Sequence, residues 1–291
     1  MASTDAKEKN RANQQSMKRR TISAKRLTGG LLIVLLVLLS LILYYNLHSS
    51  EKTIDIAIYS GRGTWQESVQ AAKNMFLWMN YTVELVSANY INTIGLGNFR
   101  VLCIPGGDMY AYSEDISAKG KENIKSFTNS GGGYIGICGG AYFASEKVIW
   151  RGNQLSMTPL ELFLGTAEGP IDEIVPYPSY NMCKVNIVSS THSITQSEPN
   201  SSWMLYYWGP ALIPNENIDV TILGQYDGGD KAMMLAFNYG QGRVFLIGTH
   251  PELEEDSNRD GVDFADELDD QGSDWELMRK AVLWMMKGQV T

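Results

Sequence analysis

Cys138 stands in a sequence pattern that suits a reactive thiol. It directly follows the apolar run from Tyr134 to Ile137, and Gly136 and Gly140 flank it in the form G-x-C-x-G. A sharp turn from a strand into a helix leaves no room for side chains two positions before or after its central residue. Such a turn lifts the sulfur above the sheet and points helix N-terminal amides toward it, which favours thiolate over thiol. The pattern predicts a nucleophilic cysteine.

His250 and Glu252 supply the two further groups that a nucleophilic thiol needs. A cysteine nucleophile requires a base, and the base requires an orienting carboxylate. The two residues follow the apolar run 243–248, so both can point into the same crevice. The other two histidines of the chain are His48, which borders an uncharged apolar segment, and His192, which lies in a polar stretch. His250 is therefore the base candidate at a strand end.

A glycine loop, Pro105-Gly106-Gly107-Asp108, also follows an apolar run. Its amides can provide an oxyanion donor beside the amide of Gly139, so we predict Gly107 and Gly139 as the oxyanion hole. The residues that we predict to bind substrate are Gly106, Asp108, Tyr142 and Glu168. Loop aromatics are more often packing residues, and that alternative stays open for Tyr142.

Cys103 and Cys183 lack such surroundings. A lone cysteine is commonly a buried, inert core residue, and this is our interpretation of both. If both lie outside the cytoplasm, a disulfide between them is the alternative. Three cysteines without a C-x-x-C pair exclude a disulfide scaffold and give no sign of structural zinc.

An acidic segment follows His250. Residues 251–276 hold twelve acidic side chains against one basic residue, Arg259. Part of this segment has the spacing of an EF-hand loop, whose calcium ligands would be Asp256, Asn258, Asp260 and Glu267. Helical flanks are not evident and Asp263 stands where EF-hands carry an apolar residue, so a solvated acidic loop is the alternative. The predicted thiol chemistry requires no cofactor. Ca²⁺, bound by the acidic segment, is the one metal ion that the sequence suggests.

The elements that must position these groups alternate between strand and helix. Apolar runs at 53–59, 99–104 and 134–138 predict buried strands. Helical spacing predicts a helix after a capping box at Thr64 and another from about Ala118 to Thr128. This alternation predicts an α/β fold with a mostly parallel sheet and helices on both faces.

The second half of the chain has a different composition. The stretch from Val148 to about Tyr226 is rich in Pro, Asn, Ser and aromatic residues, and we expect strand extensions and long loops that cover one end of the sheet. The runs 233–237 and 243–248 predict a hairpin. A capping box at Ser273 predicts a final helix.

Charge divides the chain at an uncharged segment. The net charge is −8, yet residues 1–28 hold eight basic and two acidic residues, and residues 29–50 hold none. About 20 apolar residues span a bilayer, so we expect a transmembrane helix at 29–48 that is preceded by a basic cytoplasmic tail at 1–28. The domain at 52–291 would then lie outside the cytoplasm, at the cell membrane. A cleaved signal peptide is the alternative, but the apolar run is long and no A-x-A-like site follows it.

The soluble part is strongly acidic. Residues 51–291 carry 16 basic and 30 acidic residues. Phosphate contacts need clustered Lys and Arg, so this balance argues against a nucleic-acid partner. The membrane is the one partner that the sequence predicts, beside a small-molecule or peptide amide of unknown identity.

The cysteine elbow, the upstream Pro-Gly-Gly loop and the downstream His-Pro-Glu together resemble class I glutamine amidotransferase domains. Within that superfamily, three segments resemble the N-terminal domain of eukaryotic-type biotin-protein ligases: 59–64, 133–138 and 164–170. The resemblance covers residues 54–287 and implies a flavodoxin-like fold. It also implies Cys138 as nucleophile, His250 as base and Glu252 as its orienting group. It does not imply biotin transfer, since Gly61-Arg62-Gly63 alone is not a biotin-adenylate loop.

Two functions fit these observations. The first is a thiol amidase or amidotransferase-like hydrolase in which Cys138 attacks an amide carbonyl. The second is a non-catalytic binding or regulatory module that keeps the crevice. The triad favours the enzyme, whereas the expected membrane location and the unknown acceptor favour the module.

Overall fold

The computed structural model describes residues 35–41, 54–254, 257–268 and 272–287. The chain divides into two units, Met1–Glu51 and Lys52–Thr291. In the first unit, residues 35–41 form a helix with exposed side chains, while the predicted tail and the rest of the predicted span lie outside the described residues. Over the described ranges, no helix combines the length and the apolar character needed to cross a membrane.

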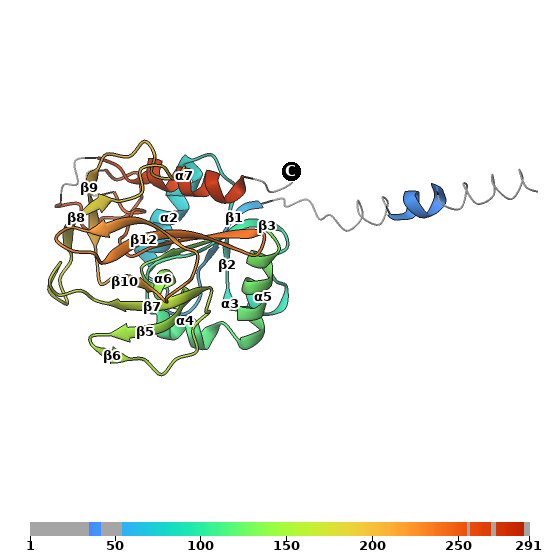
Figure 1. Cartoon of the computed structure of the whole chain (residues 1–291), viewed down its shortest axis with the longest axis horizontal. Coiled ribbons are helices and arrows are strands. Elements are labelled where there is room, and N and C mark those ends of the chain that lie inside the picture. The colour runs from blue at the N-terminus through green and yellow to red at the C-terminus, as the bar shows by residue number, and fades with distance from the viewer. Residues whose placement is uncertain (1–34, 42–53, 255–256, 269–271, 288–291) are drawn as a thin grey trace, which may run out of the picture. The chain divides into compact units, whose positions relative to one another are not determined.

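A large mixed sheet runs through the second unit (Figure 1). Its strand order is β2-β1-β3-β4-β13-β12-β11-β8-β9. The parallel strands are β1 (Ile54–Tyr59), β2 (Val83–Val86), β3 (Phe99–Ile104), β4 (Gly133–Ile137) and β13 (Gly242–Ile247). The antiparallel strands are β12 (Ala232–Tyr239), β11 (Thr221–Tyr226), β8 (Asn181–Ile187) and β9 (Ser201–Tyr206). The predicted parallel sheet is thus one half of a mixed sheet, and the predicted hairpin is β12–β13.

A second, smaller sheet has the order β10-β7-β5-β6. Its strands are β5 (Ser145–Trp150), β6 (Asn153–Gln154), β7 (Phe163–Gly169) and β10 (Ala211–Pro214). The sequence predicted only extensions and loops in this region. The strand β7 was not predicted because its sequence, FLGTAEG, lacks the regular alternation of apolar and polar residues that identifies a half-buried strand.

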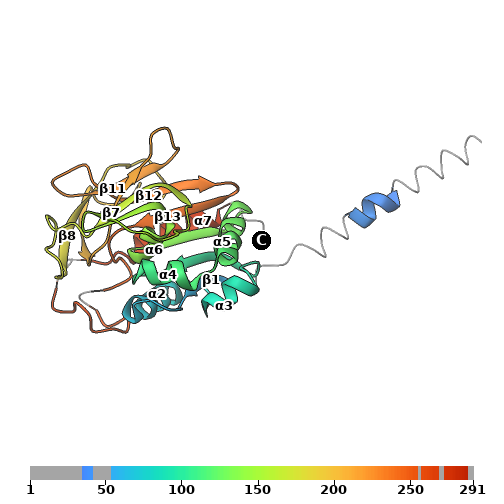
Figure 2. The same ribbon diagram turned by 90° about the horizontal axis from the view of Figure 1, so that it is seen from below.

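Helices cover both faces of the main sheet, as predicted (Figure 2). They are α2 (Gln66–Trp78), α3 (Ala88–Thr93), α4 (Met109–Asp115), α5 (Ala118–Asn129), α6 (Gly139–Ala144) and α7 (Trp275–Met286). Side chains alternate across a strand, so Ile56 and Ile58 of β1 pack with α2 and α7, while Ala57 and Tyr59 pack with α3 to α6.

The capping box predicted at Thr64 is absent. Helix α2 begins after Trp65, which has no side-chain capping bond. The hydroxyl of Thr64 instead donates to the carbonyl of Gly61 and closes the turn after β1. The Trp65 ring packs edge to face against Tyr207, His250 and Phe264.

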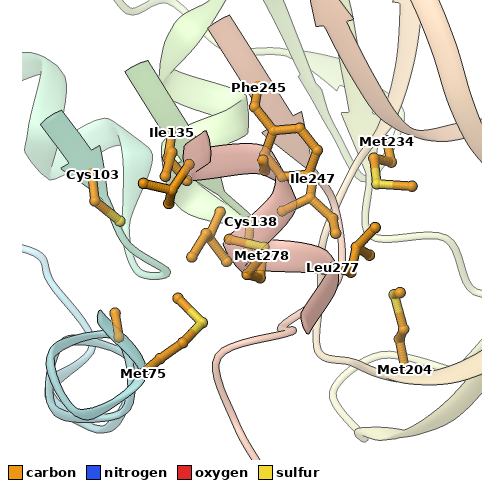
Figure 3. Close-up of a cluster of buried hydrophobic side chains, with 14 of the residues drawn as sticks. Met75, Cys103, Ile135, Cys138, Met204, Met234, Phe245, Ile247, Leu277 and Met278 are labelled. Atoms are coloured by element: carbon orange, nitrogen blue, oxygen red, sulfur yellow. The ribbon is translucent and has the colours of Figure 1, made fainter. Parts of the chain in front are cut away.

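One core layer lies between the sheet and the pair α2 and α7. Figure 3 shows Met75, Phe245 and Met278 reaching into it from α2, β13 and α7. Full burial of such a side chain contributes about 1.5–3 kcal/mol, so this layer holds the strand ends that carry the site in place.

Cys103 and Cys183 are free, buried thiols of β3 and β8, as the core interpretation predicted. Burial raises the pKa of both thiols, which keeps them protonated and unreactive. The alternative disulfide between them is not present.

Candidate active site

Cys138 occupies the turn between β4 and α6 with φ 46° and ψ −100°. Such a conformation is strained for a residue with a side chain and is typical of functional sites. A Cβ on Gly136 would lie 2.7 Å from the carbonyl oxygen of Gly140, and one on Gly140 would collide with the carbonyl of Ile104. The two glycines therefore permit the predicted turn at Cys138.

His250 and Glu252 lie just beyond the end of β13, and both are buried. Nδ1 of His250 is 2.9 Å from Oε1 of Glu252, and the main-chain N–H of His250 donates to the carbonyl of Leu205. The main-chain bond places the residue, and the Nδ1 contact with Glu252 orients the ring, which is what a base needs.

The charge state of His250 follows from its neighbours. Burial lowers the pKa of the imidazole, but the negative charges of Cys138 and Glu252 and hydrogen bonds to both outweigh it. The pKa of His250 therefore stands well above its ordinary value. The surroundings of the ring therefore favour the imidazolium form of His250.

A main-chain carbonyl lies between the two reacting groups. The carbonyl oxygen of Tyr207 is 3.5 Å from Sγ of Cys138 and 3.3 Å from Nε2 of His250. The segment that carries it follows β9, with Trp208 at φ 62°, and the hydroxyl of Tyr142 donates to the carbonyl of Trp208 over 3.0 Å. Sequence reasoning missed this group because a backbone carbonyl has no residue signature.

Ser68 is a second group that sequence reasoning missed. This fully buried α2 residue donates to Oε1 of Glu252 over 2.5 Å and accepts from the main-chain N–H of Gly106 over 2.9 Å. It thereby ties the glycine loop to the carboxylate of the triad. Its one signal in the sequence is a small polar residue beside Val69, on the buried face of a helix.

The glycine loop meets the start of α6. A Cβ on Gly139 would lie 2.7 Å from the main-chain nitrogen of Gly107, so the two backbones are in contact beside Cys138. Among the described residues, neither the Gly107 nor the Gly139 amide has a hydrogen-bond partner. Two free amides next to the sulfur are the arrangement that an oxyanion hole requires.

Gly106 and Asp108 have roles in shaping this loop. A Cβ on Gly106 would lie 2.5 Å from Cε1 of His250, so glycine allows the imidazole to approach. The carboxylate of Asp108 caps α4 by accepting from the N–H groups of Tyr110 and Ala111.

A cavity of about 580 Å³ opens over these groups. Its described lining residues are Gly63, Trp65, Gly107, Asp108, Met109, Tyr110, Cys138, Tyr142, Trp150, Leu155, Tyr207, Trp208 and His250. Of the predicted substrate-binding residues, Asp108 and Tyr142 are among them, whereas Gly106 lies behind His250.

Glu168 does not line this cavity. It borders a separate depression of about 260 Å³ together with Arg151 and Asp172. The side chains of β7 alternate in exposure, with Ala167 buried and Glu168 exposed.

Two of the predicted calcium ligands, Asp260 and Glu267, have hydrogen-bond partners within the protein, and Asn258 is exposed. The two carboxylate oxygens of Asp260 accept from the N–H groups of Glu254 and Val262, and Glu267 accepts from the hydroxyl of Tyr180 over 2.6 Å. Asp256 lies outside the described residues. Within the described part of the chain, no cluster of three or more His, Cys, Asp or Glu side chains is placed to hold a metal ion. Calcium binding stays a prediction.

Comparison with known solved structures identifies the fold. A ThuA-like protein from Bacteroides uniformis ATCC 8492 superposes with a TM-score of 0.54 at 14% identity, over 83% of this chain and 94% of that one. A glutamine amidotransferase from Thermotoga maritima superposes with a TM-score of 0.50 at 12% identity, over 80% and 99%. At these identities the likeness is one of fold, and it agrees with the predicted amidotransferase-like α/β architecture.

Sequence relatives carry the comparison further. A biotin–protein ligase from Schizosaccharomyces pombe (strain 972 / ATCC 24843) is 24% identical over 216 residues, which are 69% of this chain and 33% of that protein. An uncharacterized protein from Chlamydia muridarum (strain MoPn / Nigg) is 28% identical over 161 residues, 53% of this chain and 60% of that protein. The chain thus spans a third of the ligase and three fifths of the chlamydial protein. The family model "Biotin-protein ligase, N terminal" matches residues 54–286, and the chain therefore belongs to this family.

Proposed function

We propose that the protein is a thiol-dependent amidase with Cys138 as nucleophile, His250 as acid and base, and Glu252 as the group that orients His250. One observation carries the proposal. A cysteine in a strained elbow lies beside an imidazole whose other nitrogen is 2.9 Å from a buried carboxylate. This is the arrangement that nucleophilic catalysis by a thiol requires.

The proposed acylation step starts from a thiolate on Cys138 and an imidazolium on His250, the charge-separated form of a cysteine–histidine pair. The thiolate of Cys138 attacks the amide carbonyl, and the oxygen takes up the electron pair of the carbonyl bond beside the amides of Gly107 and Gly139. The imidazolium of His250 gives its proton to the leaving nitrogen as the carbon–nitrogen bond breaks. The amine departs and leaves a thioester on Cys138.

Deacylation reverses the roles of the pair. Neutral His250 takes a proton from water, whose oxygen attacks the thioester carbonyl. The carbon–sulfur bond then breaks, the carboxylic acid leaves, and the thiolate and imidazolium are restored. Glu252 holds the ring in one orientation through both steps.

The second part of the proposal is the location. The protein is held in the cell membrane by residues 29–48, with its basic tail in the cytoplasm and its amidase domain outside. The support is the uncharged segment and the eight basic residues that precede it.

Alkylation of the purified full chain tests the chemistry. Iodoacetamide should modify Cys138 at least about tenfold faster than Cys103 or Cys183, because only a thiolate reacts. The His250→Ala variant should lose this selectivity, and peptide mass spectrometry identifies the modified cysteine. Equal rates at the three cysteines in the folded protein would reject the enzyme and leave a binding module.

A further inference from the structure

The cavity over Cys138 has an aromatic and almost uncharged wall. Its described aromatic lining residues, apart from His250, are Trp65, Tyr110, Tyr142, Trp150, Tyr207 and Trp208, and Met109 and Leu155 add aliphatic surface. Apart from Cys138 and His250, the charged side chain among the described lining residues is Asp108, whose carboxylate already accepts two main-chain N–H groups.

The lining residues include no Lys or Arg within the described chain. Two arginines near the cavity have other partners. Arg62 pairs with Glu114 over 2.9 Å, and the guanidinium of Arg151 lies over the ring of Tyr177, 4.6 Å from its centroid. Arg151 lines the second depression instead. Apart from His250, whose proton the proposed reaction gives to the leaving nitrogen, the described lining offers no cation to a substrate carboxylate.

This composition discriminates between amide substrates by charge. The amide of free glutamine carries an ammonium and a carboxylate on the acyl side, and burying either without a partner costs several kcal/mol. An uncharged apolar group gains about 25 cal/mol for each Å² that it removes from water. The volume of about 580 Å³ lies in the range of small-molecule binding sites.

The rings of the wall are arranged in pairs. Tyr207 and Trp208 have centroids 4.4 Å apart, Tyr142 and Trp150 are 5.7 Å apart, and Trp150 and Trp208 are 6.4 Å apart. Two of these pairs are edge to face, a geometry in which a further ring gains favourable contacts. Trp208 itself has φ 62°, a left-handed conformation that is strained for a bulky residue.

We infer that the cavity accepts amides whose acyl group is uncharged and carries an aromatic ring, and that it rejects glutamine. The inference rests on the proposed amidase function of Cys138 and names the substrate class of that site. Cleavage gives an arylalkanoic acid and an amine, with water as the second reactant.

Two chromogenic amides with the same leaving group test the inference on the full chain. One is 3-phenylpropanoyl-p-nitroanilide and the other is γ-glutamyl-p-nitroanilide, so any difference in kcat/KM reports the acyl group. We expect the phenylpropanoyl amide to be preferred by at least about tenfold to a hundredfold. Equal rates, or a preference for the γ-glutamyl amide, would overturn the inference.

A matched pair of tryptophan variants tests whether the cavity wall causes the preference for the phenylpropanoyl amide. Trp150→Ala removes a ring of the wall and should reduce the preference by about tenfold. Trp203→Ala removes an exposed tryptophan of β9 that does not line the cavity, and it should leave the preference unchanged. Leu155→Ala, at the partly buried rim, is the second test should Trp150→Ala not fold, as judged by circular dichroism. Unchanged preference in folded wall variants would contradict the inference.

Binding separates failure of the inference from failure of the amidase proposal. Equilibrium binding of 3-phenylpropanamide and of glutamine to the Cys138→Ala variant is measured by calorimetry. Tighter binding of the phenyl amide without any turnover by the wild type would sustain the substrate class and reject the amidase. Turnover with a preference for glutamine would sustain the amidase and reject the class. Binding of neither amide would reject the class as well.

Discussion

The side chains of the proposed triad are held by groups to which the proposal gives no chemical step. Ser68 joins Glu252 to the main-chain N–H of Gly106, and the carbonyl of Tyr207 contacts both Cys138 and His250. Nε2 of His250 therefore already has a hydrogen-bond acceptor, the Tyr207 carbonyl, before a substrate approaches Cys138. The site is thus organised before any ligand enters it.

Ser68→Ala should destabilise the fold and loosen the triad together. The N–H of Gly106 and one oxygen of Glu252 each lose a buried partner, which costs about 1–3 kcal/mol of unfolding free energy. Urea unfolding measures the loss, and the alkylation rate of Cys138 against pH measures the loosened triad. Ser68→Thr keeps the hydroxyl and should restore the pH profile. A profile unchanged in Ser68→Ala would show that Ser68 only supports the fold.

Glu252→Gln should lower the pKa of His250. Burial lowers this pKa in either protein, and the variant loses a negative charge that opposes burial. NMR titration of the imidazole measures the change, with Glu276→Gln on the exposed side of α7 as the matched control. A pKa that does not fall in Glu252→Gln would contradict the assigned role of the carboxylate.

The raised pKa of His250 also sets the sign of a stability change with pH. The imidazolium form stabilises the fold fully below the ordinary value of about 6.5. This contribution is lost as pH rises through the higher folded-state pKa. We expect the unfolding free energy to fall over that range in the wild type and to fall less in His250→Gln. Equal slopes in the two proteins would contradict the coupling.

At the scale of elements, the glycines of the elbow let β4, β3 and α6 approach closely. Gly140 lies so close to the carbonyl of Ile104 that a methyl group would not fit between them. Gly136 lies close to the carbonyl of Gly140 in the same way. These contacts put the start of α6 against the glycine loop, where the two free amides lie.

Gly140→Ala should therefore be costly. The added methyl would collide with the carbonyl of Ile104, a backbone atom that cannot rotate away, and overpacking of this kind costs about 1–3 kcal/mol. Thermal unfolding and Cys138 alkylation should both respond. Gly97→Ala is the matched control, because its methyl meets open space. Equal stability of the two variants would contradict the tight approach.

The sequence predicted those parts of the fold and site that have a local signature. Apolar runs identified β1, β3 and β4, and the spacing of Gly136, Cys138 and Gly140 identified the elbow. The second sheet was missed because β7 is broken by glycine and Glu168. Ser68 and the carbonyl of Tyr207 were missed because they reach the site only through long-range packing, which no local pattern encodes.

At the scale of the whole molecule, the chain combines two units of opposite charge. The basic segment before the apolar run and the acidic domain after it are the basis for the proposed membrane location. The described part of the run, residues 35–41, is helical and exposes its apolar side chains, including Leu36 and Leu39.

Membrane retention should depend on these leucines. A full chain that carries Leu36→Arg and Leu39→Arg should leave the carbonate-washed membrane fraction, because each arginine near the middle of a span costs about 2.5–3.5 kcal/mol. The double alanine variant at the same positions should be retained. A wild-type chain that is recovered without its first 50 residues would instead indicate a cleaved signal peptide.

The division of the fold into two halves has a consequence for protein engineering. Cys138, His250 and Glu252 are held by the parallel strands β4 and β13, whereas Trp150 and Trp208 come from the second sheet and from the segment after β9. Mutational libraries directed at 150–155 and 207–208 can therefore vary the lining of the cavity while β4 and β13, next to the proposed triad, stay unmutated. Substitutions at Tyr207 must preserve its backbone conformation, because its main-chain carbonyl contacts both Cys138 and His250.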